Sequence, residues 1–248
     1  MPIATDGEPL LQYFQAMLRA YGPQHWWPAR SRFEIIVGAI LTQNTAWTNV
    51  EKGIEALRSA GLLDPAAMAR APRARLAALI RPTGYFNQKA ARLHRFLSFL
   101  EQRHGGDLDG LLAQSVARLR RQLLDLSGIG PETADSIILY AAGRPIFVID
   151  AYTRRILGRH GLVAEDDRYD RMQRNLHDAL PADAGLFNEY HALLVRIGKE
   201  HCLKASPRCG GCPLEPFLPA GGALQPPPLR RSPPRAAESR RKDVDPDI

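Results

Sequence analysis

Asp150 is the residue best placed for chemistry in this sequence, because it follows an apolar run and begins a new helix. The run, Ile146 to Ile149, comes directly after a break at Gly143 and Pro145. A carboxylate held at such a position can stabilise a positively charged, oxocarbenium-like sugar and can orient or deprotonate a water molecule. The same residue can also serve only as the N-cap of the helix that follows it.

A glycine turn precedes this carboxylate. Ser127-Gly128-Ile129-Gly130 separates two helical patterns and is followed by Pro131 and Glu132. Glycine allows the positive φ of a tight turn, and proline suits a first helical position because it lacks an N–H group. Backbone N–H groups at the start of a helix attract phosphate. The segment predicts a helix–hairpin–helix that binds phosphates through Gly128, Ile129, Gly130 and Thr133, with an ordinary αα-hairpin as the alternative.

The periodicity predicts an all-α fold. Nearly every periodic segment has helical spacing, and no run has the convincing alternation that predicts a strand. The helices are expected at Pro9–Ala20, Arg32–Leu41, Thr48–Ala60, Pro65–Arg70, Arg73–Ile80, Gln88–Arg103, Leu108–Ala113, Val116–Leu126, Glu132–Ala142, Ala151–Arg159, Arg168–Leu180 and Ala184–Cys202.

The composition is that of a globular protein, and its positive charge is compatible with a polyanionic partner. Hydrophobic residues make up 45% of the 248 residues, and the net charge is +7. No apolar run approaches the roughly 18 residues of a membrane span, and the first residues do not resemble a signal peptide. The three cysteines lie together and do not form a disulfide framework. We therefore expect no membrane association and a reducing, cytoplasmic location.

The order of hairpin, Gly/Pro loop and Asp150 resembles the helix–hairpin–helix DNA glycosylase superfamily, whose catalytic Asp stands at this place. The resemblance covers Gln12 to about Leu218. It implies a two-lobed fold with a DNA cleft between the lobes. Residues 29–143 are expected to form the central bundle, and residues 1–28 plus 144–218 a second lobe ending in a three-Cys loop. The composition of residues 219–248, with Gly-Gly, a triple proline, several Arg residues and few apolar anchors, predicts a disordered basic tail. A nucleoid-associated monomer acting on double-stranded DNA with damaged bases is expected.

At two positions this sequence differs from relatives in the superfamily, and each difference excludes one type of reaction. Bifunctional relatives such as endonuclease III carry a lysine on the second hairpin helix, whose amine forms a Schiff base with the sugar. Glu132 stands at that place and cannot form an imine, so a monofunctional glycosylase without β-lyase activity is expected. Adenine–mismatch relatives carry an acid where this chain has Ala39, which argues against excision of a neutral adenine.

The three tryptophans occur in two places, as Trp26-Trp27-Pro28 and as Trp47 after LTQNT. An indole attracts a cation by roughly 0.5–2 kcal/mol and stacks on an extruded base, although any single tryptophan is usually a core residue. With GYFNQKA, this pattern resembles the 3-methyladenine glycosylases of the endonuclease III-like branch. The resemblance implies that Trp47 stacks on a cationic alkylated purine and that Trp26, Trp27 and Pro28 line the pocket.

Gln43 and Lys199 are assigned through the same resemblance, and Lys89 is assigned from its place near a helix start. Gln43 is expected to insert into the duplex where the flipped base leaves the stack. Lys89 is expected to contact a phosphate, with a solvated surface residue as the alternative. Lys199, on the long helix that ends near Cys202, is expected to be a pocket or phosphate residue.

Cys202, Cys209 and Cys212 have the spacing C-x6-C-x2-C. In endonuclease III relatives this pattern continues to a fourth cysteine that completes a [4Fe–4S] site, but Leu218 stands there in this chain. Three outcomes are open: an iron–sulfur cluster with only three Cys ligands, a zinc ion held with another group such as His201, or an empty site. The cluster is favoured.

Two other functions compete with alkylpurine excision. An endonuclease III-like glycosylase acting on oxidised or mismatched bases shares the same scaffold. A noncatalytic DNA-binding protein would use the hairpin for phosphates alone and would show salt-sensitive binding without base release. Asp150 and the tryptophans make the noncatalytic protein the weakest of the three hypotheses.

Overall fold

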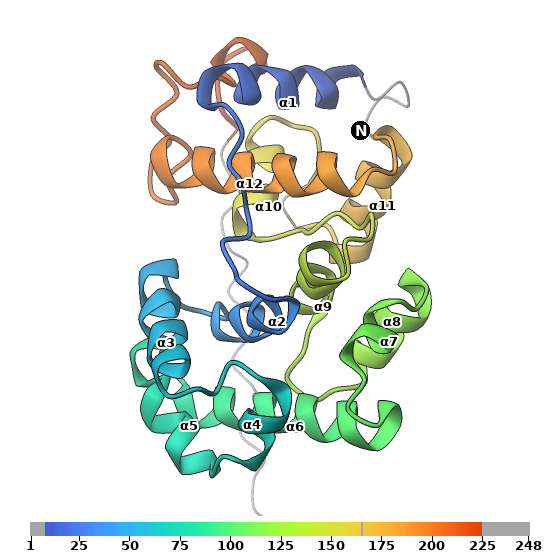
Figure 1. Ribbon diagram of the computed structural model, residues 1–248. Helices are drawn as coiled ribbons and strands as arrows, with labels where there is room; N and C mark the ends of the chain where they lie inside the picture. Colours follow the sequence, from blue (N-terminus) through green and yellow to red (C-terminus); the bar gives the residue numbers. More distant parts are fainter. Residues whose placement is uncertain (1–7, 165, 225–248) are drawn as a thin grey trace, which may run out of the picture.

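The computed structural model describes residues 8–164 and 166–224, which form helices and no strand (Figure 1). The expected all-α fold class is confirmed. Predictions for residues 1–7, 165 and 225–248, which include most of the expected tail, lie outside the described residues. The helices are α1 (Glu8–Tyr21), α2 (Arg32–Leu41), α3 (Trp47–Ser59), α4 (Pro65–Arg70), α5 (Arg73–Leu79), α6 (Phe86–His104), α7 (Leu108–Leu112), α8 (Val116–Leu124), α9 (Pro131–Ser136), α10 (Ala151–Arg159), α11 (Tyr169–Ala179) and α12 (Ala184–Glu200).

One predicted helix is not a continuous α-helix. The second hairpin helix was expected over Glu132–Ala142, but α9 ends at Ser136 and continues as η2, a π-helical turn over Ile137–Ala141. Single π turns inside helices are frequent at functional sites. All residues of η2 are buried, including Tyr140. Short 3₁₀ turns, η1 (Arg81–Thr83) and η3 (Glu215–Phe217), were also not expected.

The helices gather in two groups (Figure 1). α1, α10, α11 and α12 lie together at the upper end, where α12 packs against both α1 and α10. α2 lies near the middle and packs against α3, α6 and η2. The buried core includes residues of both groups, so the division at residue 143 stays a prediction. Within the described residues, no helix has the length and apolar character to cross a membrane.

Lys89 is a structural residue, which corrects the expected phosphate contact. It lies one turn into α6, its side chain is fully buried, and its Nζ donates to Leu41 O at 2.9 Å and Thr83 O at 2.7 Å. Burial, together with the charge of Arg92, lowers the pKa of Lys89 to about 8. The amine therefore joins the end of α2 to η1 and does not reach the surface.

We predict that Lys89→Met lowers the free energy of unfolding by about 2–4 kcal/mol, because two buried carbonyls lose their donor. Urea denaturation measures this, with Lys52→Met on the exposed side of α3 as the matched control. The salt dependence of DNA binding should be equal in both variants. If the slope of log affinity against log salt concentration became smaller by about one in Lys89→Met alone, Lys89 would contact a phosphate after all.

Candidate active site

Asp150 caps α10 and also faces a histidine from α12. Its Oδ1 accepts a hydrogen bond from Thr153 N at 2.7 Å. Its Oδ2 lies 3.6 Å from His191 Nε2, and its side chain is 12% exposed. At 3.6 Å this contact is an electrostatic one and not a hydrogen bond. The carboxylate is therefore more than a helix cap, because one oxygen is left for chemistry beside a polar ring.

The surroundings keep Asp150 ionised at neutral pH. Burial by itself acts to raise the pKa of this carboxyl, but the charge of His191 and the hydrogen bond from Thr153 outweigh that effect. The pKa of Asp150 therefore lies below its ordinary value. A carboxylate that must stabilise positive charge needs this state.

His191 is held in turn by Tyr140 of η2. The Tyr140 hydroxyl lies 2.5 Å from His191 Nδ1, and both side chains are buried. Burial, with the charges of Asp150 and Glu189, raises the pKa of Tyr140 well above its usual range, so the hydroxyl keeps its proton. When the His191 ring carries the positive charge that lowers the pKa of Asp150, both ring nitrogens are donors: Nδ1–H donates to the Tyr140 oxygen, and Nε2–H faces Asp150. Among the described residues, Nε2 has no hydrogen-bond partner.

Sequence reasoning missed Tyr140 and His191. Each occupies a position where helical spacing predicts an ordinary core residue, and no local motif marks either one. They meet Asp150 only because η2 and α10 both pack against α12.

The expected aromatic set is assembled beside these residues. The Trp47 ring centroid lies 4.6 Å from Trp26 and 5.3 Å from Trp27, and Trp27 lies 5.2 Å from Tyr140. All three tryptophans are half-buried, not sealed in the core. Trp27 lies close against Gly38, where an added Cβ would come within 2.9 Å of its ring. The indoles are thus connected to Asp150 through Tyr140 and His191.

A pocket of about 290 Å³ lies on one side of this aromatic set. Trp27, Pro28 and Trp47 line it, but Asp150 and Trp26, which was also expected in the pocket wall, do not. The other lining residues are Ile54, Arg58 and three carboxylates, Glu34, Glu51 and Glu55. Glu51 and Glu55 follow Trp47 at helical i+4 and i+8 spacing, a signal that sequence reasoning did not use. The pocket therefore combines indole faces with net negative charge.

The glycine hairpin forms, but its two glycines differ. Gly128 has φ +94°, and a Cβ there would meet the Arg92 side chain at 2.6 Å, so glycine is required. Gly130 has φ −91°, which any residue can adopt. The Ile129 side chain is buried, and its N–H already donates to Leu126 O at 2.9 Å. Ile129 is therefore unsuited to phosphate binding, and the exposed Gly128 and Gly130 carry that prediction.

Gln43 is bound to the hairpin. Its Nε2 donates to Thr133 Oγ1 at 2.8 Å and to Gly128 O at 3.0 Å, and Arg92 donates to its Oε1. Thr133 is buried, so its hydroxyl is engaged with Gln43 and does not face DNA. Insertion of Gln43 into a duplex stays a prediction, and it requires these contacts to break.

Glu132 occupies the second residue of α9 and is exposed to solvent. Crowding by protein atoms and the charge of Asp150 raise the pKa of Glu132 to about 7, while His191 acts in the opposite direction. Because the charge of Asp150 acts on Glu132, the two carboxylates lie near each other. No amine of this residue is available for imine chemistry.

Lys199 is not part of this assembly. It is exposed and follows His191 by eight residues on α12, which is about 12 Å along a helix axis. Lys199 does not line the pocket beside the tryptophans, and a phosphate contact of this exposed side chain stays a prediction. His191 is the α12 residue that faces the carboxylate.

The three cysteines line one small cavity of about 20 Å³, roughly the room for a single water. Arg159 donates to Cys202 Sγ at 3.3 Å, and Leu218 lines the same cavity. Burial, with the nearby Cys209 and Cys202, raises the pKa of the Cys212 thiol. Across the described ranges, no group of three His, Cys, Asp or Glu side chains is arranged to hold a metal ion. The donors do not fit a four-thiolate cluster, and a cluster with three Cys ligands stays a prediction.

Comparisons with known proteins agree with this geometry. The family model described as HhH-GPD superfamily base excision DNA repair protein matches residues 37–182. The chain is 41% identical over 217 residues to MJ1434 of Methanocaldococcus jannaschii, whose name gives DNA repair glycosylase only provisionally, and this covers 85% of the chain and 96% of that protein.

Two solved structures resemble the fold. The 3-methyladenine DNA glycosylase of H. pylori, bound to 1,N6-ethenoadenine, has a TM-score of 0.68 and 26% identity, covering 80% of this chain and 98% of that one. A non-covalent endonuclease III–DNA complex has a TM-score of 0.73 and 22% identity, covering 86% and 94%. The endonuclease III likeness shows the fold.

We predict that His191→Gln moves the acidic limb of the pH–rate profile for base release to higher pH. Without the histidine charge, burial of Asp150 is less well opposed, so its pKa rises and the ionised form is lost at a higher pH. The direction follows because activity needs the carboxylate and falls as pH drops through its pKa. His201→Gln, at the Cys loop, should leave the profile in place. An unmoved limb in His191→Gln would contradict the assignment.

We predict that protein purified without oxygen contains iron and sulfide, bound by Cys202, Cys209 and Cys212. Metal analysis and visible absorbance measure this, and Cys209→Ser should lose both signals. Protein with zinc and no iron would identify the zinc alternative, and protein with neither would show an empty site.

Proposed function

Because the chain belongs to the HhH-GPD superfamily of base excision DNA repair proteins, we propose that it hydrolyses the N-glycosidic bond of alkylated purines such as 3-methyladenine. DNA glycosylase activity is that of the family, and the choice of base is our inference. The observation that carries it is an ionised Asp150 facing His191, beside three half-buried tryptophans and without a lysine at position 132.

Asp150 acts on the sugar. Bond cleavage leaves positive charge on the deoxyribose, and a fixed carboxylate in a partly buried site stabilises that charge more strongly than water does. The same carboxylate can orient the attacking water and accept its proton. His191 maintains the ionised state and, through Tyr140, connects it to the aromatic set.

The three tryptophans explain the preference for an alkylated purine base. An alkylated purine is cationic, so it is a good leaving group and needs little help from an acid. Indole faces attract a cation, and the carboxylates of the adjacent pocket add to the attraction. The H. pylori 3-methyladenine glycosylase, which the chain resembles over 98% of that relative's length, supports the same substrate class.

Glu132 supports a monofunctional reaction. A β-lyase of this superfamily needs an amine that attacks the sugar, and a carboxylate at this place cannot supply one. Base release by this chain should therefore leave an intact abasic strand that breaks only on alkaline treatment.

An endonuclease III-like glycosylase acting on oxidised or mismatched bases is the second candidate. It is favoured by the similarity in fold to the endonuclease III–DNA complex. Glu132 weighs against the lyase part of that activity, and the net negative pocket weighs against an uncharged base.

We predict release of 3-methyladenine and 7-methylguanine from methylated DNA, and a rate about 100- to 1,000-fold lower in Asp150→Asn, as for loss of one fixed electrostatic group. Asn keeps the helix cap, so DNA binding should persist. Asp183→Asn is the matched control, because Asp183 caps α12 in the same way.

A panel of oligonucleotides, assayed with and without alkali, gives the opposing outcomes. Release of oxidised pyrimidines with no methylated purine would select the second candidate. Borohydride trapping of a covalent DNA complex would overturn the monofunctional reaction. Salt-sensitive binding without release of any base would leave a noncatalytic DNA-binding protein.

A further inference from the structure

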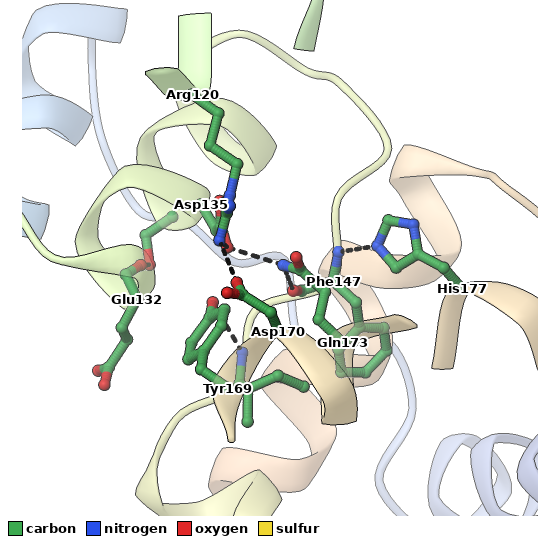
Figure 2. Close-up of polar contacts among 10 residues, drawn as sticks. Arg120, Glu132, Asp135, Phe147, Tyr169, Asp170, Gln173 and His177 are labelled. Atoms are coloured by element: carbon green, nitrogen blue, oxygen red, sulfur yellow. Dashed lines mark hydrogen bonds and ion pairs between the residues drawn. The ribbon is translucent and has the colours of Figure 1, made fainter. Parts of the chain in front are cut away.

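Asp135 is a buried carboxylate that the proposed reaction does not use. It lies on α9, three residues after Glu132, and its side chain is 0% exposed. Arg120 donates through Nε to Oδ1 at 2.7 Å and through Nη2 to Oδ2 at 3.3 Å, and Gln173 Nε2 donates to Oδ2 at 2.7 Å (Figure 2). A buried ion pair of this kind is weak grounds for stability, because desolvation offsets much of the attraction. The hydrogen-bond partners of Asp135 explain its burial better than a contribution to stability does.

The partners of Asp135 also hold the chain that leads to Asp150. Gln173 Nε2 donates a second hydrogen bond, to Phe147 O, at 2.7 Å. Phe147 N donates to His177 Nε2 at 2.9 Å, and Ile149 N donates to the Tyr169 hydroxyl at 3.3 Å (Figure 2). All three side chains come from α11.

This stretch needs such partners because it has no secondary structure of its own. Residues 143–150 form neither helix nor strand, and Phe147 and Ile149 are buried. Buried backbone groups without a hydrogen bond are costly, so side chains must satisfy them. Side chains of α11 supply the hydrogen bonds that a neighbouring strand would otherwise supply. These bonds also fix the position of Asp150, which follows directly after Ile149.

The protonation states agree with this arrangement. Burial, reinforced by the charge of Asp135, raises the pKa of Tyr169 well above its usual range. The hydroxyl therefore keeps its proton and lies where the charge of Asp135 acts on it, while it accepts from Ile149 N. Burial lowers the pKa of His177, so its ring stays neutral and can accept from Phe147 N. Glu132 points away from the network in Figure 2.

We propose that Asp135 is a positioning residue that, through Tyr169 and Gln173, fixes the Phe147–Ile149 backbone and thereby the place of Asp150 relative to the hairpin. The hairpin helix that carries Asp135 also carries the phosphate-binding glycines at its start. DNA held by the hairpin is then held in register with the carboxylate. A misplacement of about 1 Å can cost about 100-fold in rate, so this register matters. The inference rests on the proposed glycosylase activity.

The test compares Tyr169→Phe with Tyr13→Phe. Both remove one hydroxyl, and the Tyr13 hydroxyl bonds His160 and Phe217 O, remote from Asp150. We expect Tyr169→Phe to lower the single-turnover rate of base release about tenfold, with affinity for DNA containing an abasic-site analogue unchanged within about twofold. Exchange of the Ile149 amide hydrogen should become faster, while the Phe147 amide, bound to His177, should not. Tyr13→Phe should change none of these.

Asp135→Asn extends the test, because it removes the charge at nearly constant shape. It should lower the rate further, by about 100-fold. If Asp135→Asn fails to fold, Tyr169→Phe still decides the matter. A rate and an Ile149 exchange equal to wild type in Tyr169→Phe would overturn the proposal, as would faster exchange with an unchanged rate.

The two proposals fail differently. Wild-type protein that releases no base from any substrate overturns the proposed function. The amide exchange of Ile149, which needs no substrate, then decides alone whether the network holds this backbone.

Discussion

The contact between Asp150 and His191 is the interaction on which the site depends. A carboxylate that is only 12% exposed tends to take up a proton unless charge or hydrogen bonds oppose it. His191 Nε2 at 3.6 Å and Thr153 N at 2.7 Å supply that opposition. The histidine in turn needs Tyr140 at its other nitrogen. The packing of η2 and α10 on α12 therefore brings together the groups that keep Asp150 ionised.

Two carboxylates on one short helix show how surroundings separate their roles. Glu132 and Asp135 are three residues apart on α9. Asp135 is enclosed and fully hydrogen-bonded by Arg120 and Gln173, so it can serve as a fixed anchor. Glu132 reaches solvent near Asp150, and its pKa is raised to about 7. Asp135 is therefore held inside the protein by its partners, while Glu132 on the same short helix reaches solvent.

Local patterns predicted the parts of this molecule that are locally determined. The all-α class and most helix bounds follow from periodicity, and Asp150 follows from the hairpin, the loop and the cap. The tryptophans were correctly grouped because they lie close in sequence or at helix starts. Lys89 was wrongly assigned, because a basic side chain at the protein surface and one in the interior look alike in the sequence until neighbouring helices are in place. His191 and Asp135 contact residues that lie far away along the chain, so no local motif predicts their roles.

The most direct test of this account is a carbon-13 NMR titration of the Asp150 carboxyl group in the free protein. We predict a pKa below the ordinary value of about 3.9 for an aspartate, and a higher pKa when His191 is replaced by Gln. A carboxyl group that titrates at or above the ordinary value in the wild-type protein, with no response to His191→Gln, would contradict it.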